Sequence, residues 1–129
     1  MRTAAAADVD VDAASITLEN FRWDITATDG IDAPLDVNSA DFTLRDCDIT
    51  LADSTGQADA FLVTATAADR MRFIGNTVRA TTAGANSAIS IEGTPNGIEI
   101  AGNHIYGDFA LAAISNPTRN VATNLNIHD

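Results

Sequence analysis

Lysine is missing from this 129-residue sequence, and all seven basic residues are arginines. The chain carries 18 carboxylates, so its formal net charge at pH 7 is −11. Nucleic acids and anionic membrane surfaces are bound by clustered cations, and we therefore expect neither as a partner. The acidity needs no ligand to explain it, because a high net charge keeps a protein soluble.

Cysteine, aromatic residues and long apolar runs are also scarce. Cys47 is the single cysteine, which excludes an intrachain disulfide and a zinc site built from thiolates. Hydrophobic residues make up 46% of the chain but aromatic ones only 5%, which predicts a narrow core of Ile, Val, Leu and Ala. No run of apolar residues is long enough to span a membrane. The Ala- and Asp-rich N-terminus has no long apolar segment, so no secretory signal peptide is predicted.

What the sequence does contain is a short pattern that recurs along the chain. Residues 98–106 (IEIAGNHIY) alternate apolar and polar side chains, turn a corner at Gly-Asn, and then alternate again. The same layout starts at residues 16, 42 and 71, and begins once more at 125, so the spacings are 26, 29, 27 and 27. A fixed period of roughly 20–50 residues is typical of stacked repeat architectures.

The content of each repeat selects among these architectures. Two-residue alternation of β-branched and aromatic side chains predicts strands, and no stretch shows the sustained 3.6-residue period of a helix. A strand-only repeat of about 27 residues is longer than a hexapeptide β-helix turn and shorter than a propeller blade. The sequence therefore predicts an all-β fold, a right-handed single-stranded parallel β-helix of about four rungs and a partial fifth.

We expect this solenoid to occupy residues 15–129 as one domain. Residues 1–14 match no rung, and they are predicted to be either a cap over the first rung or a leader outside the fold. Each rung should read strand, corner, strand, loop, strand and closing turn. The loop varies in length between rungs, which stacking permits because loops face solvent.

The corner carries a resemblance to a known family. A Φ-x-Φ-x-Gly-Asn-x-Φ pattern at residues 71–78 and 98–105 resembles the corners of right-handed parallel β-helices in the pectate-lyase-like superfamily. In that fold, Asn side chains stack inside the corner and hydrogen-bond the backbone at the bend. The resemblance covers residues 15–129. The ladder that it implies consists of Asn76 and Asn103, with Cys47 and Phe21 continuing the column.

The superfamily contains polysaccharide lyases and hydrolases, and phage tailspikes and other virion proteins resemble it. Because one fold carries many functions, the outward-facing residues have to distinguish them. An enzyme of this type needs carboxylates clustered on one face of stacked rungs. Three outward columns can be aligned, and none places two carboxylates on neighbouring rungs. The columns are Thr17, Thr43, Arg72, Glu99 and Asn126; Glu19, Arg45, Ile74, Ala101 and His128; and Arg22, Asp48, Thr77 and His104.

Each of these columns instead contains one pair of opposite charges on neighbouring rungs. Such pairs contribute a few tenths to about 1 kcal/mol and disfavour slipped stacking. We therefore interpret them as devices that set the register. The pairs are Arg72 with Glu99, Glu19 with Arg45, and Arg22 with Asp48.

Other carboxylates lie in predicted loops, where a catalytic pair would have to form. If the chain is an enzyme, its candidate catalytic residues are Asp29, Asp53 and Asp108. The sequence does not place these three relative to one another, and we expect no catalytic site and no cofactor.

An Asp-x-Asp-x-Asp pattern near the N-terminus is similar to the start of a calcium-binding loop. Its ligands would be Asp8, Asp10 and Asp12. Ala13 stands where such a loop needs a hinge glycine, and neither flank is helical. A solvated acidic strand is the alternative, and we expect no metal site.

The two histidines, the single tyrosine and the cysteine complete the set of candidate residues. His104 and His128 belong to different columns and have no third ligand in the pattern, so no zinc site is predicted. Tyr106 is an outward aromatic side chain and, with His104, is the candidate contact for a carbohydrate or a protein partner. Cys47, at a corner, is expected to be a buried and inert thiol.

These observations favour a non-catalytic structural or interaction module of a larger assembly. Such a module resembles the β-helical part of a phage virion protein, such as a tailspike, a fibre or a capsid decoration protein. An open stack end exposes apolar interior and strand edges. The fifth rung that begins at residue 125 therefore needs either another chain or more of the same polypeptide to cover it, unless the sequence is a fragment. We expect other subunits as partners, in a homo-oligomer or a virion, with carbohydrate as a further candidate and a virion or extracellular location. The alternatives are a fragment of a carbohydrate-active β-helix enzyme and a bacterial surface adhesin.

Overall fold

The computed structural model describes residues 2–3, 9–25, 33–52, 60–81, 86–116 and 123–129. All regular secondary structure within these ranges is β-strand, arranged in three five-stranded parallel sheets. Sheet A consists of β1 (Arg2–Thr3), β4 (Arg22–Ile25), β7 (Asp48–Leu51), β10 (Thr77–Ala80) and β13 (His104–Gly107). Sheet B consists of β2 (Val9–Val11), β5 (Leu35–Val37), β8 (Ala60–Thr64), β11 (Ser87–Ser90) and β14 (Ile114–Ser115). Sheet C consists of β3 (Thr17–Glu19), β6 (Thr43–Arg45), β9 (Arg72–Ile74), β12 (Glu99–Ala101) and β15 (Asn126–His128).

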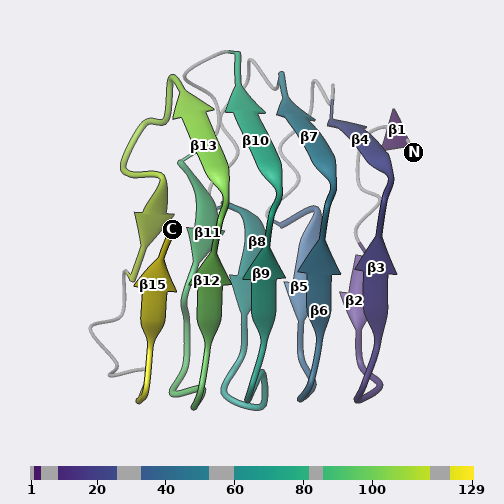
Figure 1. Ribbon diagram of the computed structural model, residues 1–129, viewed down its shortest axis with the longest axis vertical. Helices are drawn as coiled ribbons and strands as arrows, with labels where there is room; N and C mark the ends of the chain where they lie inside the picture. Colours follow the sequence, from purple (N-terminus) through teal and green to yellow (C-terminus); the bar gives the residue numbers. More distant parts are fainter. Residues whose placement is uncertain (1, 4–8, 26–32, 53–59, 82–85, 117–122) are drawn as a thin grey trace.

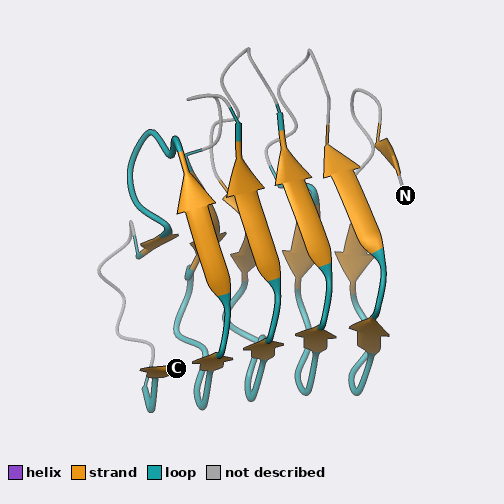
Figure 2. Cartoon of the chain, turned by 45° about the horizontal axis from the view of Figure 1, so that its top comes forward, coloured by secondary structure: helices purple, strands orange, loops and turns teal. Residues whose placement is uncertain are grey.

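The chain visits the three sheets in a fixed order and so winds into a solenoid. It climbs the near face of Figure 1 through sheet C and then sheet A, and returns behind them through sheet B. In Figure 1 the chain rises on the near side and descends on the far side while it advances from the N-terminal end at the right to the C-terminal end at the left, which makes the coil right-handed; Figure 2 shows the strands of successive turns lying side by side. The strands of sheet C start at residues 17, 43, 72, 99 and 126, which reproduces the spacing of the sequence pattern. The predicted parallel β-helix of about four turns is confirmed.

Two columns of sharp corners make this winding possible. The corner between sheets C and A has a residue with φ between 55° and 65° in each rung, which is the left-handed region. Glycine adopts this conformation without strain, and Asn and Asp tolerate it better than other residues. These corner residues are Asn20, Asp46, Gly75 and Gly102.

A second corner column, immediately before sheet C, was not recognised from the sequence. Its residues have φ between 55° and 78° and recur with the same spacing as the strands. They are Ser15, Asp41, Arg70, Gly97 and Asn124. All except Arg70 are common turn residues. Their recurrence just before each apolar run could therefore have predicted this second corner.

The core is a set of columns in which inward side chains stack from rung to rung. Leu44, Phe73 and Ile100 follow one another in sheet C and are 0–2% exposed. The core is less purely aliphatic than its composition predicts, because most of the few aromatic rings lie inside. Trp23 and Phe61 are buried and meet edge to face, with ring centroids 5.1 Å apart.

The first rung departs from the burial that its alternation predicts. The pattern that starts at residue 16 predicts that Ile16 and Leu18 point inward, but Ile16 is 37% exposed and Leu18 is half-buried. The reason is that β3 is the edge strand of sheet C, so no further rung of that sheet covers these side chains. Parts of the N-terminal segment 1–14 do join the stack, since β1 pairs with β4 and β2 pairs with β5.

Candidate interaction surface at the ends of the stack

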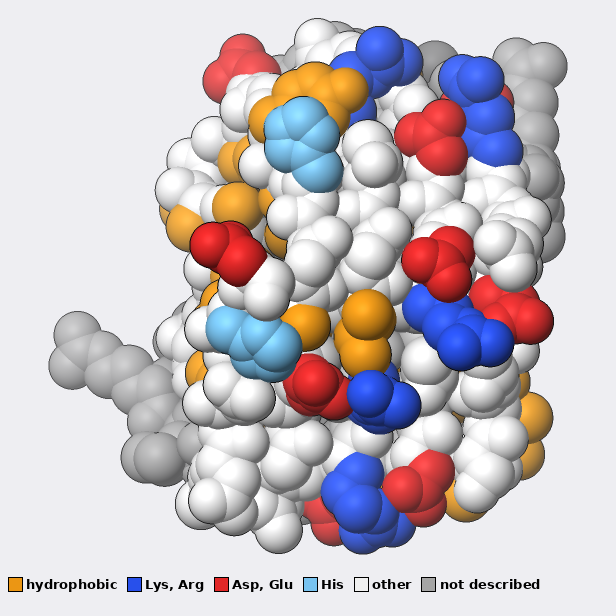
Figure 3. Space-filling model, viewed as in Figure 1, with side chains coloured by type: hydrophobic (Ala, Val, Ile, Leu, Met, Phe, Trp, Pro, Cys, Tyr) orange, Lys and Arg blue, Asp and Glu red, His pale blue; other side chains and the backbone are white. Residues whose placement is uncertain are grey.

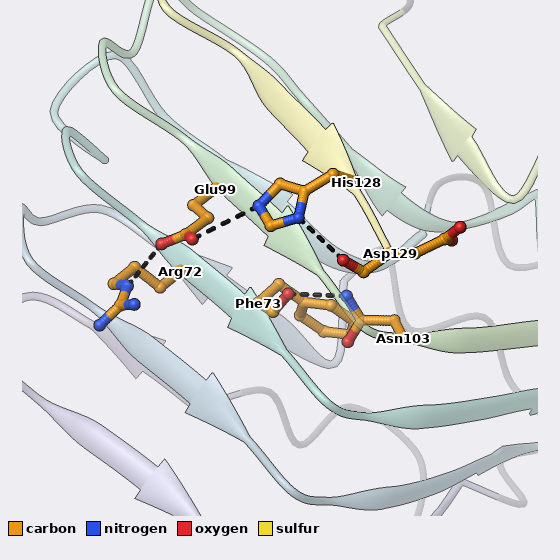
Figure 4. Close-up of polar contacts among 6 residues, drawn as sticks. All are labelled: Arg72, Phe73, Glu99, Asn103, His128 and Asp129. Atoms are coloured by element: carbon orange, nitrogen blue, oxygen red, sulfur yellow. Dashed lines mark hydrogen bonds and ion pairs between the residues drawn. The ribbon is translucent and has the colours of Figure 1, made fainter.

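The corner between sheets C and A holds a ladder of side-chain amides. Asn76 accepts a hydrogen bond from the Cys47 N–H at 3.0 Å and donates one to the Leu44 carbonyl at 3.0 Å. Asn103 repeats this one rung later, accepting from the Asn76 N–H at 2.8 Å and donating to the Phe73 carbonyl at 2.7 Å. Each Asn therefore connects its own rung to the preceding one. Figure 4 draws the hydrogen bond from the Asn103 amide to the Phe73 carbonyl. Both residues therefore stabilise the fold, and Asn76 is buried.

Cys47 stands below this ladder and is 3% exposed. Its thiol donates a hydrogen bond to the Arg45 carbonyl at 3.1 Å. Burial raises the pKa of the thiol above its usual value. The protonated, enclosed sulfur is a packing group, because the thiolate is the reactive form of cysteine.

The outer face of sheet C carries ion pairs that join neighbouring rungs. Arg72 donates to Glu99 at 2.8 Å, and His128 of the next rung lies with Nε2 3.6 Å from the other Glu99 oxygen (Figure 4). Glu19 is bound by Arg45 in the same way. Figure 3 shows these acidic and basic groups side by side on one face. Hydrogen bonding to Arg72, with His128 adding to it, lowers the pKa of Glu99.

A third ion pair lies at the corner column before sheet C. Both nitrogens of the Arg70 guanidinium fork reach the Asp41 carboxylate, each at 2.7 Å. This contact lowers the pKa of Asp41 and raises that of Arg70. It also explains how an arginine is held at a left-handed corner, which favours smaller residues. An alignment of the predicted strands does not reveal this ion pair, because Asp41 and Arg70 both lie outside the strands.

Arg22 takes a partner that the aligned columns did not single out. Arg22 and Asp48 are opposite each other in the register of β4 and β7, as the sequence predicts. The Arg22 Nε donates to Asp24, two residues further along the same strand, at 3.1 Å. Alternation places Arg22 and Asp24 on the same face, so the short contact within the strand competes with the one between rungs.

The candidate catalytic and calcium-binding residues do not come together in the described part of the chain. Asp29, Asp53 and Asp8 lie outside the described residues. Asp108 is exposed, and Asp10 is exposed on β2. Asp12 accepts a hydrogen bond from the Asn38 amide at 3.2 Å. Within the described ranges, no three His, Cys, Asp or Glu side chains gather closely enough to hold a metal ion, and no helix there is long and apolar enough to cross a membrane.

The candidate binding residues lie together on β13, the last strand of sheet A. The rings of His104 and Tyr106 have centroids 4.6 Å apart and are tilted by 30°. Both side chains are exposed, Tyr106 by 42%. β13 is the edge strand of sheet A at the C-terminal end, and the two pale-blue histidines lie apart from each other in Figure 3. This aromatic pair therefore borders the end of the stack.

Among the described residues, none covers the C-terminal end of the stack. It consists of the edge strands β13, β14 and β15 and a hollow of about 420 Å³ between them. Ile127 is 54% exposed and Leu125 39%, although the equivalent side chains one rung earlier, Ile100 and Ile98, are 2% and 1% exposed. The side chains that line the hollow are Ile100, Asn103, Ile105, Ala113, Ile114, Ile127, His128 and Asp129.

The N-terminal end is open in a similar way. A hollow of about 330 Å³ lies there, and its lining is more apolar than polar. Its residues come from β2, β3 and the segment between them: Val9, Asp10, Val11, Asp12, Ala13, Ile16 and Leu18. Unpaired strand edges next to exposed apolar interior are features of sites where another chain associates. The two ends are therefore the candidate functional surfaces of the described structure.

Comparisons of this chain with protein-family models, with curated proteins and with solved structures found no match. Its function is therefore inferred from the geometry of the stack and of its two ends.

Proposed function

We propose that this chain is a structural, non-catalytic module of a larger protein assembly and that it docks through the open ends of its β-helix. One observation carries the proposal. Ile127 and Leu125 occupy core columns, yet they are 54% and 39% exposed where β15 forms the edge of sheet C. An apolar interior displayed together with unpaired strand edges is stabilised by a partner that supplies the next strands.

The outer face of the stack supports the same proposal. Glu99 and Asp41 are each held by an arginine that lowers the pKa of the carboxyl group. A general acid for polysaccharide cleavage needs the opposite shift, toward neutral pH. At neutral pH these carboxylates are anions that hold neighbouring rungs together, which is a structural use of the face.

The finer form of the proposal is a virion component. The corner ladder, the acidic lysine-free surface and the short stack resemble the β-helical parts of phage tailspikes, fibres and capsid decoration proteins in the pectate-lyase-like superfamily. A protein of that kind would act in the virion or outside the cell, with other subunits as its partners. The resemblance lies in the corner residues and the coil, so the proposal has to be tested on the assembly itself.

The test uses the tagged chain in its natural source, separated by mass in a sedimentation gradient. We expect the wild-type chain to migrate with a high-mass particle and Ile127→Asp to migrate as a free chain. Ile74→Asp is the matched control, since Ile74 is a half-buried isoleucine of the same sheet in mid-stack. The proposal is wrong if the wild-type chain migrates as a free chain.

Carbohydrate contact is the second candidate function, and the paired rings of Tyr106 and His104 favour it. An exposed aromatic face beside a polar ring suits stacking against a sugar. Binding of the wild-type chain to a panel of polysaccharides, lost in Tyr106→Ala, would support it. The same panel, assayed for cleavage with Asp29→Asn, Asp53→Asn and Asp108→Asn, tests the alternative of a β-helix enzyme.

A further inference from the structure

We propose that the partner at the C-terminal end is the N-terminal end of a second copy of this chain, so that copies stack head to tail and continue all three sheets. This inference rests on the proposed function and names the partner of the open end. The two ends lie at opposite extremes of the coil in Figure 1, which is the arrangement that head-to-tail stacking needs.

The first support is the order in which the chain visits its sheets. The first three described strands, β1, β2 and β3, belong to sheets A, B and C, and the last three, β13, β14 and β15, belong to the same sheets in the same order. Each sheet therefore contains five strands. A second copy placed on the C-terminal end starts again at sheet A, where the first copy has just completed sheet C. All three sheets gain their next strand in one docking step.

The second support is the match between apolar side chains at the two ends. In mid-stack, each inward side chain has a rung packed on either side of it. Leu44, Met71 and Ile89 are fully buried in this way. The same columns end in half-exposed side chains at both ends of the molecule. Continuing the observed register across the junction places apolar side chains against apolar side chains. The contacts formed would be Leu18 on Ile127, Ile16 on Leu125, and Val9 on Ile114.

The third support is the charge on the outer face of sheet C. Arg72, Glu99 and His128 alternate in character on successive rungs up to the C-terminal end. The register places Glu19 of the second copy next to His128, and Thr17 next to Asn126. The register therefore brings a carboxylate next to an imidazole and a hydroxyl next to a side-chain amide at the junction, and both pairs can hydrogen-bond.

The overall charge acts against this contact and gives it a recognisable salt dependence. Each copy carries −11, so two copies repel through their long-range fields. Salt screens that repulsion over about 10 Å at 0.1 M, whereas burial of apolar side chains is not weakened by it. Stacking should therefore strengthen as salt is raised, the opposite of an association driven by ion pairs.

A head-to-tail contact does not close on itself, so it generates a linear rod when no other subunit stops it. Five strand spacings of about 4.8 Å give a rise of roughly 24 Å per copy. This repeat is what electron microscopy of the purified chain at high salt should show.

The decisive experiment uses one blocked end at a time. Ile127→Asp blocks the C-terminal end, Leu18→Asp blocks the N-terminal end, and Ile74→Asp is the mid-stack control. We expect analytical ultracentrifugation of the purified chain, from about 0.05 to 0.5 M salt, to show growing multiples of the single mass for wild type and control. Each end variant alone should stay a single chain. Their mixture should form a dimer and nothing larger, because one intact C-terminal end then meets one intact N-terminal end.

Two outcomes overturn the inference. A two-fold contact between like ends would let Leu18→Asp dimerise alone and would leave the mixture without a mixed dimer. A wild-type chain that remains single at the highest salt and concentration, while folded by circular dichroism, excludes stacking of copies altogether. If Leu18→Asp does not fold, Ile16→Asp blocks the same end at a side chain that is already 37% exposed.

The failure of this inference can be told apart from failure of the proposed function. If the purified chain stays single but the chain in its source migrates with a particle and Ile127→Asp releases it, another protein occupies the end. The proposed function then stands, and head-to-tail stacking is wrong. If the chain stays single in both settings, both are wrong.

Discussion

Inward side chains of one column behave differently in the middle of the stack and at its two ends. Phe73 and Ile127 share a column and a register, yet Phe73 is fully buried and Ile127 is 54% exposed. The strands around them have the same length and the same alternation. The difference is the number of neighbouring rungs, since each rung closes the core of the one before it. Stability in such a solenoid is a sum of contacts between neighbours, and an end rung lacks half of them.

The largest expected effect compares the middle and the end of that column directly. Phe73→Ala should cost about 3–5 kcal/mol, because it leaves a cavity with rungs packed on both sides. Ile127→Ala should cost about 1 kcal/mol or less, because over half of that side chain is already in water. Urea unfolding at low salt, where the proposed stacking of copies is weakest, measures both. Equal losses at the two positions would contradict the difference between middle and end.

The corner ladder gives the next largest effect. Replacing either ladder Asn by Ala should cost about 1–3 kcal/mol, since backbone groups at the bend lose their partners. The loss should be greater at Asn76, which is 1% exposed and lies between two rungs, than at half-buried Asn103. Thermal melts of both variants test this order. Thr77→Ala, at the neighbouring outward position, is the control and should melt close to wild type.

Acid should weaken the contacts between rungs. The folded-state pKa values of Asp41 and Glu99 lie below their usual values, because Arg70 and Arg72 stabilise the ionised carboxylates. Their contribution is therefore complete above the ordinary carboxyl pKa and is lost as the pH falls through the depressed one. Melting temperatures should drop as the pH is lowered below about 4. Asp41→Asn should melt lower than wild type at neutral pH and show a shallower decline in acid; an unchanged slope would argue against the role of this pair.

Tyr106→Ala should have the smallest effect. The ring is exposed on the outer face of β13, and surface substitutions of this kind usually change stability by less than about 0.5 kcal/mol. Asn103→Ala, three residues earlier in the same rung but turned inward, is the internal comparison. A larger loss at Tyr106 than at Asn103 would mean that the inward and outward assignment of this rung is wrong.

The comparison of middle and end also separates what could be predicted from what could not. Alternation, Gly-Asn corners and a recurring spacing are local features, and they were sufficient to predict three strands per rung and their register. The ion pair of Arg72 with Glu99 followed from that register. The pair of Asp41 with Arg70 was missed because it lies in a corner column that carries no alternation.

The order of residues in this chain already contains its period, its strand direction and the face to which each side chain points, because these depend on alternation and on corners that few residue types tolerate. Burial, choice of ionic partner and the shape of the two ends depend on which rung lies next to which, and they emerged only from the folded coil. Arg22 illustrates this: the aligned rungs offered it Asp48, and the packed strand also brought Asp24 within 3.1 Å. The exposure of Ile127 is of the same kind, because it depends on β15 being the edge strand of sheet C in space.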